Sequence, residues 1–268
     1  MQIQAEQGYI IVAQNNQSTD YVRLARALSR SLRWFQPDAK ICLLTDQCID
    51  GGRDFDFVKV FPYGDQAQDR DWKLVNDWQC FAATPFRETI KLEADMVITA
   101  PIDHWFSCCR QLPVVLTHGA RNYLGTLTDR RDYRQVFDVN DLPDVYNAIT
   151  YWRLSREAQE FFFMVRDIFH NWDSVMRTLK YATDQPINTD LAYALAAKIL
   201  GADRFRLPQD VPSLIHMKPA ICGTSGDWTR ELVWEFEPGS LRINTMQQLW
   251  PVHYHVKSWV QEIERVYE

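Results

Sequence analysis

Short apolar, β-branched runs alternate with helical patterns through the first third of this 268-residue chain, and that alternation limits the possible folds more than any other feature. A helix with apolar residues at helical spacing is expected after Asp20, and a second over residues 73–83. Strand, helix and strand at this spacing indicate parallel pairing, because parallel neighbours need a long crossover connection. We therefore expect an α/β fold with a mostly parallel central sheet flanked by helices. The runs expected as buried strands are residues 9–13, 40–45, 57–60 and 89–92.

The second half of the chain carries fewer regular patterns. Residues 155–180 predict one long amphipathic helix or two broken ones, and residues 189–200 predict another helix. After residue 205 the sequence is rich in Pro, Trp and His and shows little periodicity. No Gly/Ser/Pro-rich linker, charge block or repeat divides the chain, so residues 1–268 are expected to form a single domain.

Charge and cysteine content exclude some classes of protein. The formal net charge of −6 gives no global attraction to a polyanion such as nucleic acid. The six cysteines are scattered and form no C-x-x-C pair with metal spacing, which favours free thiols in a reducing compartment. The first residues lack a basic segment and a long apolar run, so neither a signal peptide nor a membrane anchor is expected. These features predict a soluble, cytoplasmic protein without a membrane partner.

Polar residues follow several of the expected strands, where open parallel sheets bind their ligands. Glu93 and Asp95 come just after the strand at 89–92, and they point the same way if the chain stays extended. Two such carboxylates can hold a divalent cation that neutralises a diphosphate leaving group. Acidic pairs of this kind are also common on solvated turns, so the surrounding sequence has to decide.

The sequence around this pair, KLEADMVITAPIDHWF, resembles a glycosyltransferase pattern in which a strand leads to Asp-x-Asp, an apolar strand and Pro-Ile-Asp. Upstream, DWKL at 71–74 resembles the Thr-Lys-Leu segment of glycogenin, whose lysine touches the sugar donor. The chain is thus similar to glycosyltransferase family 8, the glycogenin-like enzymes. That resemblance implies a GT-A type fold, with Lys73 as a donor contact. The departure is Glu93, which stands where the family has the first aspartate.

Residues 13–32 resemble the uridine-binding start of glycogenin. The resemblance implies that Ala13, Asn15, Asn16 and Tyr21 bind the donor nucleotide. A tyrosine face can stack on a base, and asparagine amides can hydrogen-bond to base and ribose. For Tyr21, a buried aromatic in the first turn of a helix is an equal alternative.

Two later motifs resemble parts of the family's sugar site. PDVYNA at 143–148 is similar to Pro-Asp-x-Phe-Asn-Ser, which implies that Asn147 faces the donor sugar. Asp184 and Gln185, with Asn188 following, resemble the Asp-Gln-x-x-x-Asn motif beside the anomeric carbon. This second resemblance implies that Asp184 and Gln185 are catalytic. The alternative for it is a helix N-cap with a buried glutamine.

The segment VHYHVKSW at 252–259 resembles the C-terminal His-Phe-x-Gly-x-x-Lys-Pro-Trp motif, shortened by two residues. The resemblance implies that Lys257 contacts the diphosphate and that a histidine joins the two carboxylates as the third ligand of Mn²⁺ or Mg²⁺. Neutral imidazole suits a metal, and lysine suits a phosphate as a point charge. His253 is favoured over His255, because Val-His-aromatic aligns with the family.

The chain also resembles, along nearly its whole length, uncharacterised proteins of tailed bacteriophages, which implies the host cytoplasm as its location. His216 and Lys218 belong to this phage pattern rather than to glycogenin. For these two residues a second phosphate contact, an acceptor contact and a structural turn all remain open. The shared segments are DWKL (71–74), KLEAD (91–95), IDHW (102–105), LPDVY (142–146), DQP (184–186), HMKPA (216–220) and HYHVKSW (253–259).

Together these features predict a metal-dependent glycosyltransferase that moves a sugar, with retention as in family 8, from a UDP-sugar to a hydroxyl acceptor. A nucleotidyltransferase of the same fold is disfavoured, because residues 14–17 lack the glycines of a phosphate-cradling loop. A degenerate nucleotide-sugar or nucleic-acid binding module without transferase activity is the main alternative.

The acceptor is the least constrained partner. The phage resemblance suggests hydroxymethylated bases in viral DNA, ahead of a glycan or a protein hydroxyl, and duplex DNA requires a basic surface. An arginine series between Arg23 and Arg33 has helical spacing and fits a solvated helix face. The arginines expected to supply the acceptor surface are Arg121, Arg130, Arg131 and Arg134.

Overall fold

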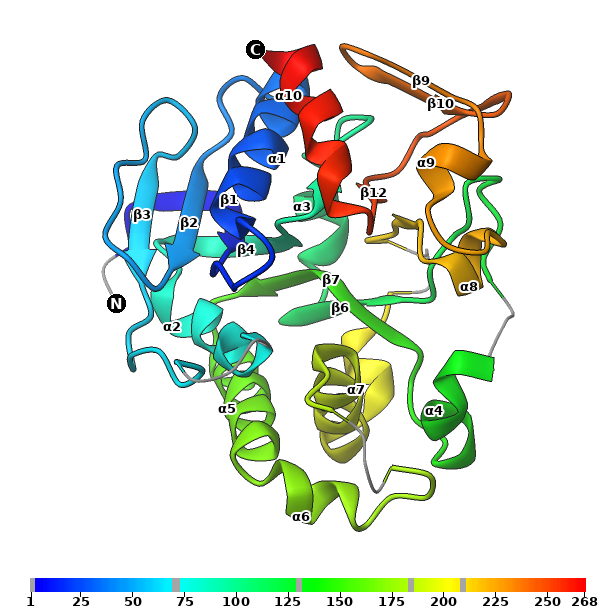
Figure 1. Ribbon diagram of the computed structural model, residues 1–268. Coiled ribbons are helices and arrows are strands. Elements are labelled where there is room, and N and C mark those ends of the chain that lie inside the picture. The colour runs from blue at the N-terminus through cyan, green and yellow to red at the C-terminus, as the bar shows by residue number, and fades with distance from the viewer. Residues whose placement is uncertain (1–2, 69–72, 129–131, 183–185, 208–210) are drawn as a thin grey trace.

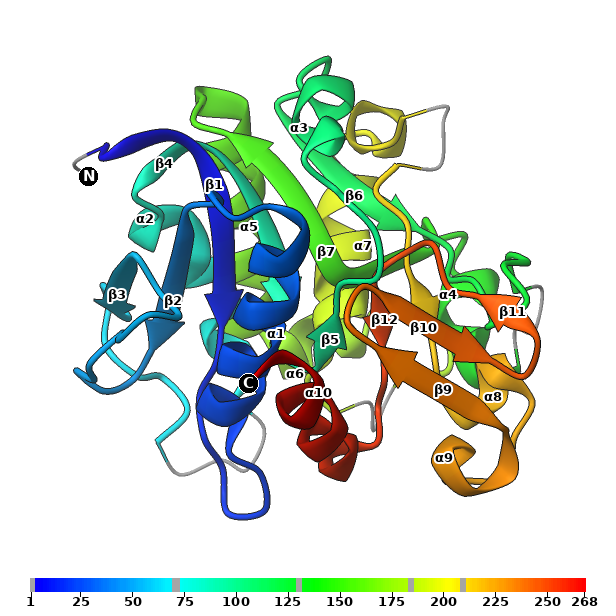
Figure 2. The same ribbon diagram turned by 90° about the horizontal axis from the view of Figure 1, so that it is seen from above.

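Within the residues that the computed structural model describes (3–68, 73–128, 132–182, 186–207 and 211–268), six strands form a central sheet (Figures 1 and 2). In spatial order they are β3 (Phe57–Val60), β2 (Ile41–Thr45), β1 (Ala5–Val12), β4 (Phe86–Glu93), β7 (Val145–Arg153) and β6 (Val114–His118). The first four run parallel, whereas β7 is antiparallel to both β4 and β6. The expected α/β fold with a mostly parallel sheet is confirmed, but β6 and β7 were not predicted as strands.

Helices cover both faces of this sheet and enclose a hydrophobic core on each (Figure 1). Those on one face are α1 (Tyr21–Phe35), α3 (His104–Cys109) and α10 (Val260–Tyr267). Those on the other face are α2 (Cys80–Ala83), α5 (Arg156–His170) and α7 (Thr189–Leu200). In β1, Tyr9 and Ile11 belong to the first core and Ile10 to the second, as the alternation of a strand requires. Burial on both faces explains why residues 9–12 of this strand are apolar without interruption, whereas Glu6 and Gln7 near its start are exposed.

Helix α1 begins where Asp20 caps it, because the Asp20 carboxylate accepts a hydrogen bond from the backbone N–H of Arg23. The arginines on its outer side are ion-paired within the protein. Arg26 and Arg30 both reach Asp54, each at 3.0 Å. These ion pairs therefore hold α1 against the segment that contains Asp54. The other arginines of this helix pair as Arg23–Glu264 and Arg33–Asp56.

The helices predicted from periodicity are present with small changes. Residues 155–180 form α5 and the shorter α6 (Trp172–Met176), so the broken version of that prediction is correct. Helix α7 has the predicted bounds. The helix expected over 73–83 begins as the 3₁₀ helix η1 (Leu74–Gln79) and continues as α2.

The region after residue 205 contains more regular structure than its sequence predicts. Two strands of this region form a small sheet with β5 (Met96–Val97) from earlier in the chain. In this sheet β12 (Val252–His253) lies between β5 and β8 (Ile215–His216). Strand β12 is antiparallel to β5 and parallel to β8. Three segments that are far apart in the sequence thus meet beside the carboxyl end of β4.

A second small sheet lies beside α10 and consists of β9 (Trp234–Glu237), β10 (Ser240–Ile243) and β11 (Met246–Gln247) (Figure 2). Aromatic side chains pack against this sheet: the centre of the Trp259 ring lies 5.2 Å from the ring centres of Trp228 and Phe236. The region after residue 205, which shows little periodicity in its sequence, thus contains regular strands. Contacts between distant aromatic residues stabilise this region, and such contacts leave no periodic signal.

The remaining described elements are short and connect the larger ones. No helix within the described ranges has the length and apolar character needed to cross a bilayer. All six cysteines lie in those ranges and are free, as expected. The short elements are η2 (Asp132–Arg134), α4 (Gln135–Val139), η3 (Ala202–Phe205), α8 (Pro219–Cys222), α9 (Trp228–Glu231) and η4 (Lys257–Trp259).

Candidate metal centre and donor site

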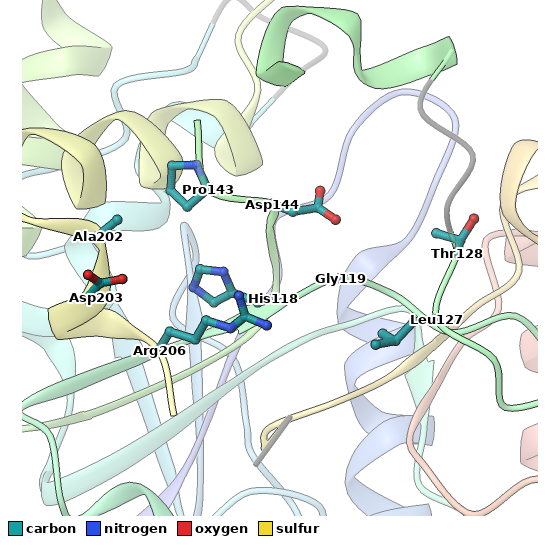
Figure 3. Close-up of a pocket in the computed structure, with 9 residues that line it drawn as sticks. All are labelled: His118, Gly119, Leu127, Thr128, Pro143, Asp144, Ala202, Asp203 and Arg206. Atoms are coloured by element: carbon teal, nitrogen blue, oxygen red, sulfur yellow. The ribbon is translucent and has the colours of Figure 1, made fainter. Parts of the chain in front are cut away.

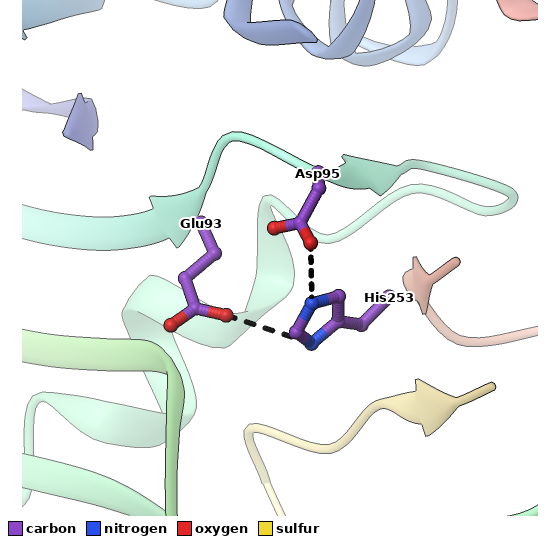
Figure 4. A group of neighbouring side chains, drawn as sticks. All are labelled: Glu93, Asp95 and His253. Carbon is purple, nitrogen blue, oxygen red and sulfur yellow. Dashed lines mark hydrogen bonds and ion pairs between the residues drawn. The ribbon is translucent and has the colours of Figure 1, made fainter. Parts of the chain in front are cut away.

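Glu93, Asp95 and His253 converge at the carboxyl edge of the central sheet (Figure 4). Each offers a ligand atom, and these atoms all lie within 4.8 Å of one another. The His253 Nε2 atom is 2.7 Å from a carboxylate oxygen of Asp95, and Nδ1 is 3.5 Å from one of Glu93. The structure therefore brings together the three residues that the sequence predicted as metal ligands.

Strand pairing assembles this cluster from two distant parts of the chain. Glu93 is the last residue of β4, and a turn through Asp95 leads into β5. Strand β12 pairs with β5 so that His253 lies opposite Met96. His255 lies outside the cluster; it is exposed and has a left-handed backbone φ of 60°. The geometry thus agrees with the choice of His253 over His255.

A dense group of opposite charges surrounds Asp95. Lys257 Nζ and His253 Nε2 both contact the Oδ2 atom of Asp95. Burial alone would raise the pKa of Asp95, but His253 and Lys257 outweigh burial and hold that pKa well below its usual range. Burial alone would lower the pKa values of His253 and Lys257, yet Asp95 outweighs it and raises both. Asp95, His253 and Lys257 therefore favour one another's charged forms.

The ligand atoms fit a divalent cation such as Mn²⁺ or Mg²⁺. Two carboxylates supply the oxygen ligands that these ions prefer, and the imidazole adds a nitrogen. His253 Nδ1 is buried and finds no hydrogen-bond partner in the described part of the chain. The ring therefore retains an unsatisfied polar atom inside an acidic cluster. A bound cation would take over the charge balance that Lys257 now provides for Asp95.

The residues expected to bind the donor nucleotide lie in the loop between β1 and α1. Ala13 is buried, and Tyr21 is the first residue of α1. Lys257 Nζ lies 5.6 Å from the centre of the Tyr21 ring, which brings this loop next to the metal cluster. The Oδ1 atoms of Asn15 and Asn16 accept backbone N–H bonds within the loop and the start of α1. Both asparagines therefore help to set the shape of the loop.

Lys73 and Asn147, which were also expected to contact the donor, form hydrogen bonds within the protein instead. Lys73 Nζ donates hydrogen bonds to the carbonyl oxygens of residues 67–68, at 2.6 and 3.2 Å. Asn147 is fully buried. Its amide nitrogen donates to Asp77 at 3.1 Å, and its Oδ1 accepts from Thr150 at 2.9 Å. The expectation that the Asn147 side chain faces the donor sugar is corrected, because both ends of its amide are used in the core.

Asn147 belongs to a buried polar network that the sequence analysis missed. Asp77 forms an ion pair with Lys91 at 2.7 Å and accepts hydrogen bonds from Asn147 and Tyr193. Lys91 is only 1% exposed although it lies in β4. Burial alone would lower the pKa of Lys91, but Asp77 outweighs burial and raises it. The sequence contained one indication of this network, namely Lys91 inside the otherwise apolar run at 89–92.

Asp190 is a second residue that the sequence analysis did not select. It lies in the first turn of α7, where its Oδ1 accepts the backbone N–H of Asn147 at 2.8 Å. Burial raises the pKa of Glu93, and the negative charge of Asp190 adds to that rise. Asp190 is therefore close enough to the metal cluster to act on it electrostatically. Its signal in the sequence was an acidic residue at the start of a predicted helix.

Arg134 was expected on an exposed basic surface, and the structure corrects this. The side chain is buried, with its guanidinium carbon 3.8 Å from the centre of the Phe137 ring and 4.0 Å from that of Tyr146. It forms ion pairs with Asp144 at 3.0 Å and Asp190 at 3.3 Å. Arg134 therefore joins two carboxylates inside the protein.

The other residues expected to bind an acceptor are distributed differently. Arg121 donates hydrogen bonds to Ser213 and to the carbonyl of Gly125, and its guanidinium carbon lies 4.8 Å from the centre of the Trp250 ring. His216 lies opposite His253 in the β8–β12 pairing, so it borders the metal cluster. The expected residues that lie outside the described ranges are Arg130, Arg131, Asp184 and Gln185.

Lys218 follows β8 and directs its Nζ to within 4.8 Å of the centre of the Tyr133 ring. Its backbone N–H donates to His216 Nδ1 at 3.2 Å. Tyr133 in turn hydrogen-bonds to Tyr146 at the start of β7. Lys218 thus connects the segment that contains His216, through Tyr133, to the start of β7.

Comparison with known proteins identifies the type of fold. The mouse xyloside xylosyltransferase 1 structure covers 94% of this chain and 98% of its own, with a TM-score of 0.51 and 10% identity. The galactosyltransferase LgtC, solved with donor and acceptor sugar analogues, covers 97% and 95%, also with a TM-score of 0.51 and 10% identity. No protein-family model matches the sequence, and no curated protein matches it.

A third similar structure is larger. The glycosyltransferase GlyE of Streptococcus pneumoniae matches over 76% of this chain with 12% identity and a TM-score of 0.42. The chain spans 46% of the length of GlyE. The two matches that extend over nearly both chains decide the fold: this protein has the GT-A glycosyltransferase fold.

Proposed function

We propose that this protein is a metal-dependent glycosyltransferase that moves a sugar from a UDP-sugar to a hydroxyl group of an acceptor. The observation that carries the proposal is the cluster of Glu93, Asp95 and His253 at the carboxyl edge of a GT-A sheet. Fold likeness alone leaves a degenerate binding module possible. An acidic cluster with an imidazole, at the sheet edge where ligands of open α/β folds bind, supports chemistry on a diphosphate.

In this proposal Glu93, Asp95 and His253 hold Mn²⁺ or Mg²⁺, which supplies charge neutralisation for the departing diphosphate when it is bound. Lys257 moves from Asp95 to a phosphate oxygen and stabilises the negative charge that develops there. Tyr21 lies beside Lys257 and offers its ring to the uracil base. Ala13, Asn15 and Asn16 shape the loop against which the nucleotide rests.

The family resemblance implies retention of configuration at the anomeric carbon. Asp184 and Gln185 remain the residues that we propose for the face of the sugar opposite the diphosphate. Asp190 is a further carboxylate near the cluster, and Arg134 and the backbone of Asn147 hold it in place. Lys73 is kept as a donor contact that has to leave its carbonyl partners when the donor binds.

A screen of UDP-sugars for hydrolysis tests this function. The protein is stripped with EDTA and assayed with and without added Mn²⁺, and Asp95→Ala serves as the inactive reference. We expect UDP release from at least one donor in wild type, dependent on metal and absent in the variant. Donor binding without turnover under any condition would instead support the degenerate binding module.

For the acceptor we propose a carbohydrate hydroxyl rather than hydroxymethylated DNA. A duplex needs several exposed cations in one surface. Arg134 is buried, and Arg121 is hydrogen-bonded inside the protein. Transfer assays with a hydroxymethylated duplex and with simple glycosides, at two salt concentrations, distinguish the two acceptor classes. Salt-sensitive transfer to the duplex would restore the DNA hypothesis.

A further inference from the structure

A pocket of about 240 Å³ opens beside the end of β6 and the start of β7 (Figure 3). His118 is the last residue of β6, and Asp144 directly precedes β7. Asp203 and Arg206 come from η3 and the residue after it, and Thr128 closes the opposite side. None of these five residues belongs to the proposed metal or nucleotide site.

The position of the pocket relates it to the metal cluster. Strand β7 is antiparallel to both β4 and β6, so its start lies at the same edge of the sheet as the ends of those two strands. Glu93 ends β4, and His118 ends β6 and pairs with Val145. The pocket and the cluster therefore lie along the same edge of the sheet, at strands that flank β7 in the strand order.

Arg134 joins the pocket to the start of α7. Its guanidinium pairs with Asp144, which lines the pocket, and with Asp190 in the first turn of that helix. Because Arg134 is buried between the Phe137 and Tyr146 rings, these pairs hold their geometry firmly. The wall of the pocket is thus fixed relative to the first turn of α7.

The chemistry of the lining indicates the kind of ligand. The lining contains two carboxylates, Asp144 and Asp203, together with the guanidinium of Arg206 and the imidazole of His118, and Thr128 adds a hydroxyl. Such a mixture offers both donors and acceptors without an excess of positive charge. It suits the hydroxyl groups of a neutral sugar better than the phosphates of a nucleic acid. The volume lies below the ~300–1,000 Å³ of pockets for drug-sized ligands, which favours one small ring.

We propose that this pocket is the acceptor subsite and that it binds one neutral sugar ring of a saccharide acceptor. The inference rests on the proposed transferase function for its role, but binding in the pocket is testable without any turnover. The sugar hydroxyls would be held by Asp144, Asp203 and Arg206. The hydroxyl to be glycosylated would then point along the sheet edge toward the donor.

The test uses Asp203→Asn and Arg206→Gln, singly and together, because both side chains are exposed and contribute little to the core. The matched control is Asp173→Asn with Arg177→Gln, an exposed pair on and just after α6 that lies outside the pocket. The probes are the methyl glycosides of glucose, galactose, mannose and N-acetylglucosamine. Their binding to the UDP- and Mn²⁺-loaded protein is measured by saturation-transfer NMR, and transfer and donor hydrolysis are assayed in parallel.

We expect at least one glycoside to bind wild type and the control. Loss of one charged hydrogen-bonding group should weaken that binding roughly 10- to 100-fold in the pocket variants, with Mn²⁺–UDP affinity and donor hydrolysis unchanged. No binding of any glycoside, or equal binding by the pocket variants, overturns the subsite. Glycoside binding without donor hydrolysis would instead contradict the transferase function and leave the saccharide pocket standing.

Discussion

The imidazole rings of His216 and His253 stack, with their centres 4.4 Å apart and their planes inclined by 23°. They are cross-strand partners in the β8–β12 pairing. Histidine ligands of metals usually donate their second ring nitrogen to a carboxylate or a carbonyl, which fixes the ring orientation. In His253 both nitrogens are directed toward the carboxylates of the cluster instead. The flat face of His216 therefore takes the place of a hydrogen bond in holding the ring.

This stacking predicts opposite results for two substitutions at position 216. His216→Phe keeps a flat ring and should keep the Mn²⁺ affinity of the UDP complex within a few-fold of wild type. His216→Gln keeps a hydrogen-bonding group but loses the ring, so the Mn²⁺ affinity should fall about 10-fold or more. Calorimetric titration of Mn²⁺ in the presence of UDP measures both. The reverse order would show that a hydrogen bond of His216, and not its stacking, supports the site.

Asp95 should be the most sensitive position of the cluster. Asp95→Asn keeps the size of the side chain but removes the charge that balances Lys257 and His253. Donor hydrolysis is expected to fall about 100-fold or more, because charge compensation for the diphosphate is lost. Asp167→Asn, an exposed aspartate on α5, is the control and should keep full activity. An active Asp95→Asn enzyme would remove Asp95 from the metal site.

Glu93 stands where the glycogenin-like pattern that the sequence resembles has aspartate, so the length and the charge of its side chain can be separated. Glu93→Asp should remain active, since that pattern places a shorter carboxylate at this position. Glu93→Gln should bind Mn²⁺ more weakly, because it loses the ionised oxygen that faces His253. Mn²⁺ titration of both variants decides the matter. Unchanged affinity in the Gln variant would mean that Glu93 is not a ligand.

The two histidines of the HYH segment provide a matched pair. His253→Ala should weaken metal-dependent UDP binding strongly, because it removes a ligand atom of the cluster. His255→Ala removes an exposed ring and should change binding only slightly. Calorimetry of UDP with and without Mn²⁺ compares them directly. A larger loss in the His255 variant would show that the metal centre uses the other histidine.

The Asp77–Lys91 pair predicts an effect on stability rather than on the metal. Asp77→Ala leaves the ammonium group of Lys91 buried without its carboxylate and should lower the free energy of unfolding by about 3 kcal/mol or more. Lys91→Met should cost less, because Asp77 retains hydrogen bonds from Asn147 and Tyr193. Urea unfolding of both variants, at saturating and at zero Mn²⁺, measures this. Equal losses would indicate that the ion pair is not what stabilises this network.

The helices and strands that were predicted correctly are those whose own residues carry a recognisable local pattern. The run at 57–60 and the helix at 189–200 have the predicted bounds, because a short β-branched and aromatic run and a helix with an N-cap each leave a local signature. The strand at 57–60 is only half-buried, however, because β3 lies at the edge of the sheet. Strand β7 was missed, although eight of its nine residues are buried. Its sequence was interpreted as a motif, and its antiparallel position in the sheet depends on partners far along the chain.

The sequence determined the fold class, and with its resemblance to the glycogenin-like pattern it also indicated the members of the cluster. The acidic pair Glu93 and Asp95 is by itself common on solvated turns, but the resemblance of its surroundings and of the C-terminal segment VHYHVKSW to that pattern selected three side chains that meet in space. Only the tertiary structure decided which polar groups remain available to a ligand. Asn147 and Arg134 carry suitable groups, but burial couples them to Asp77 and to Asp144. A buried polar group must find a partner inside the protein, and that partner lies at a distance no local pattern encodes.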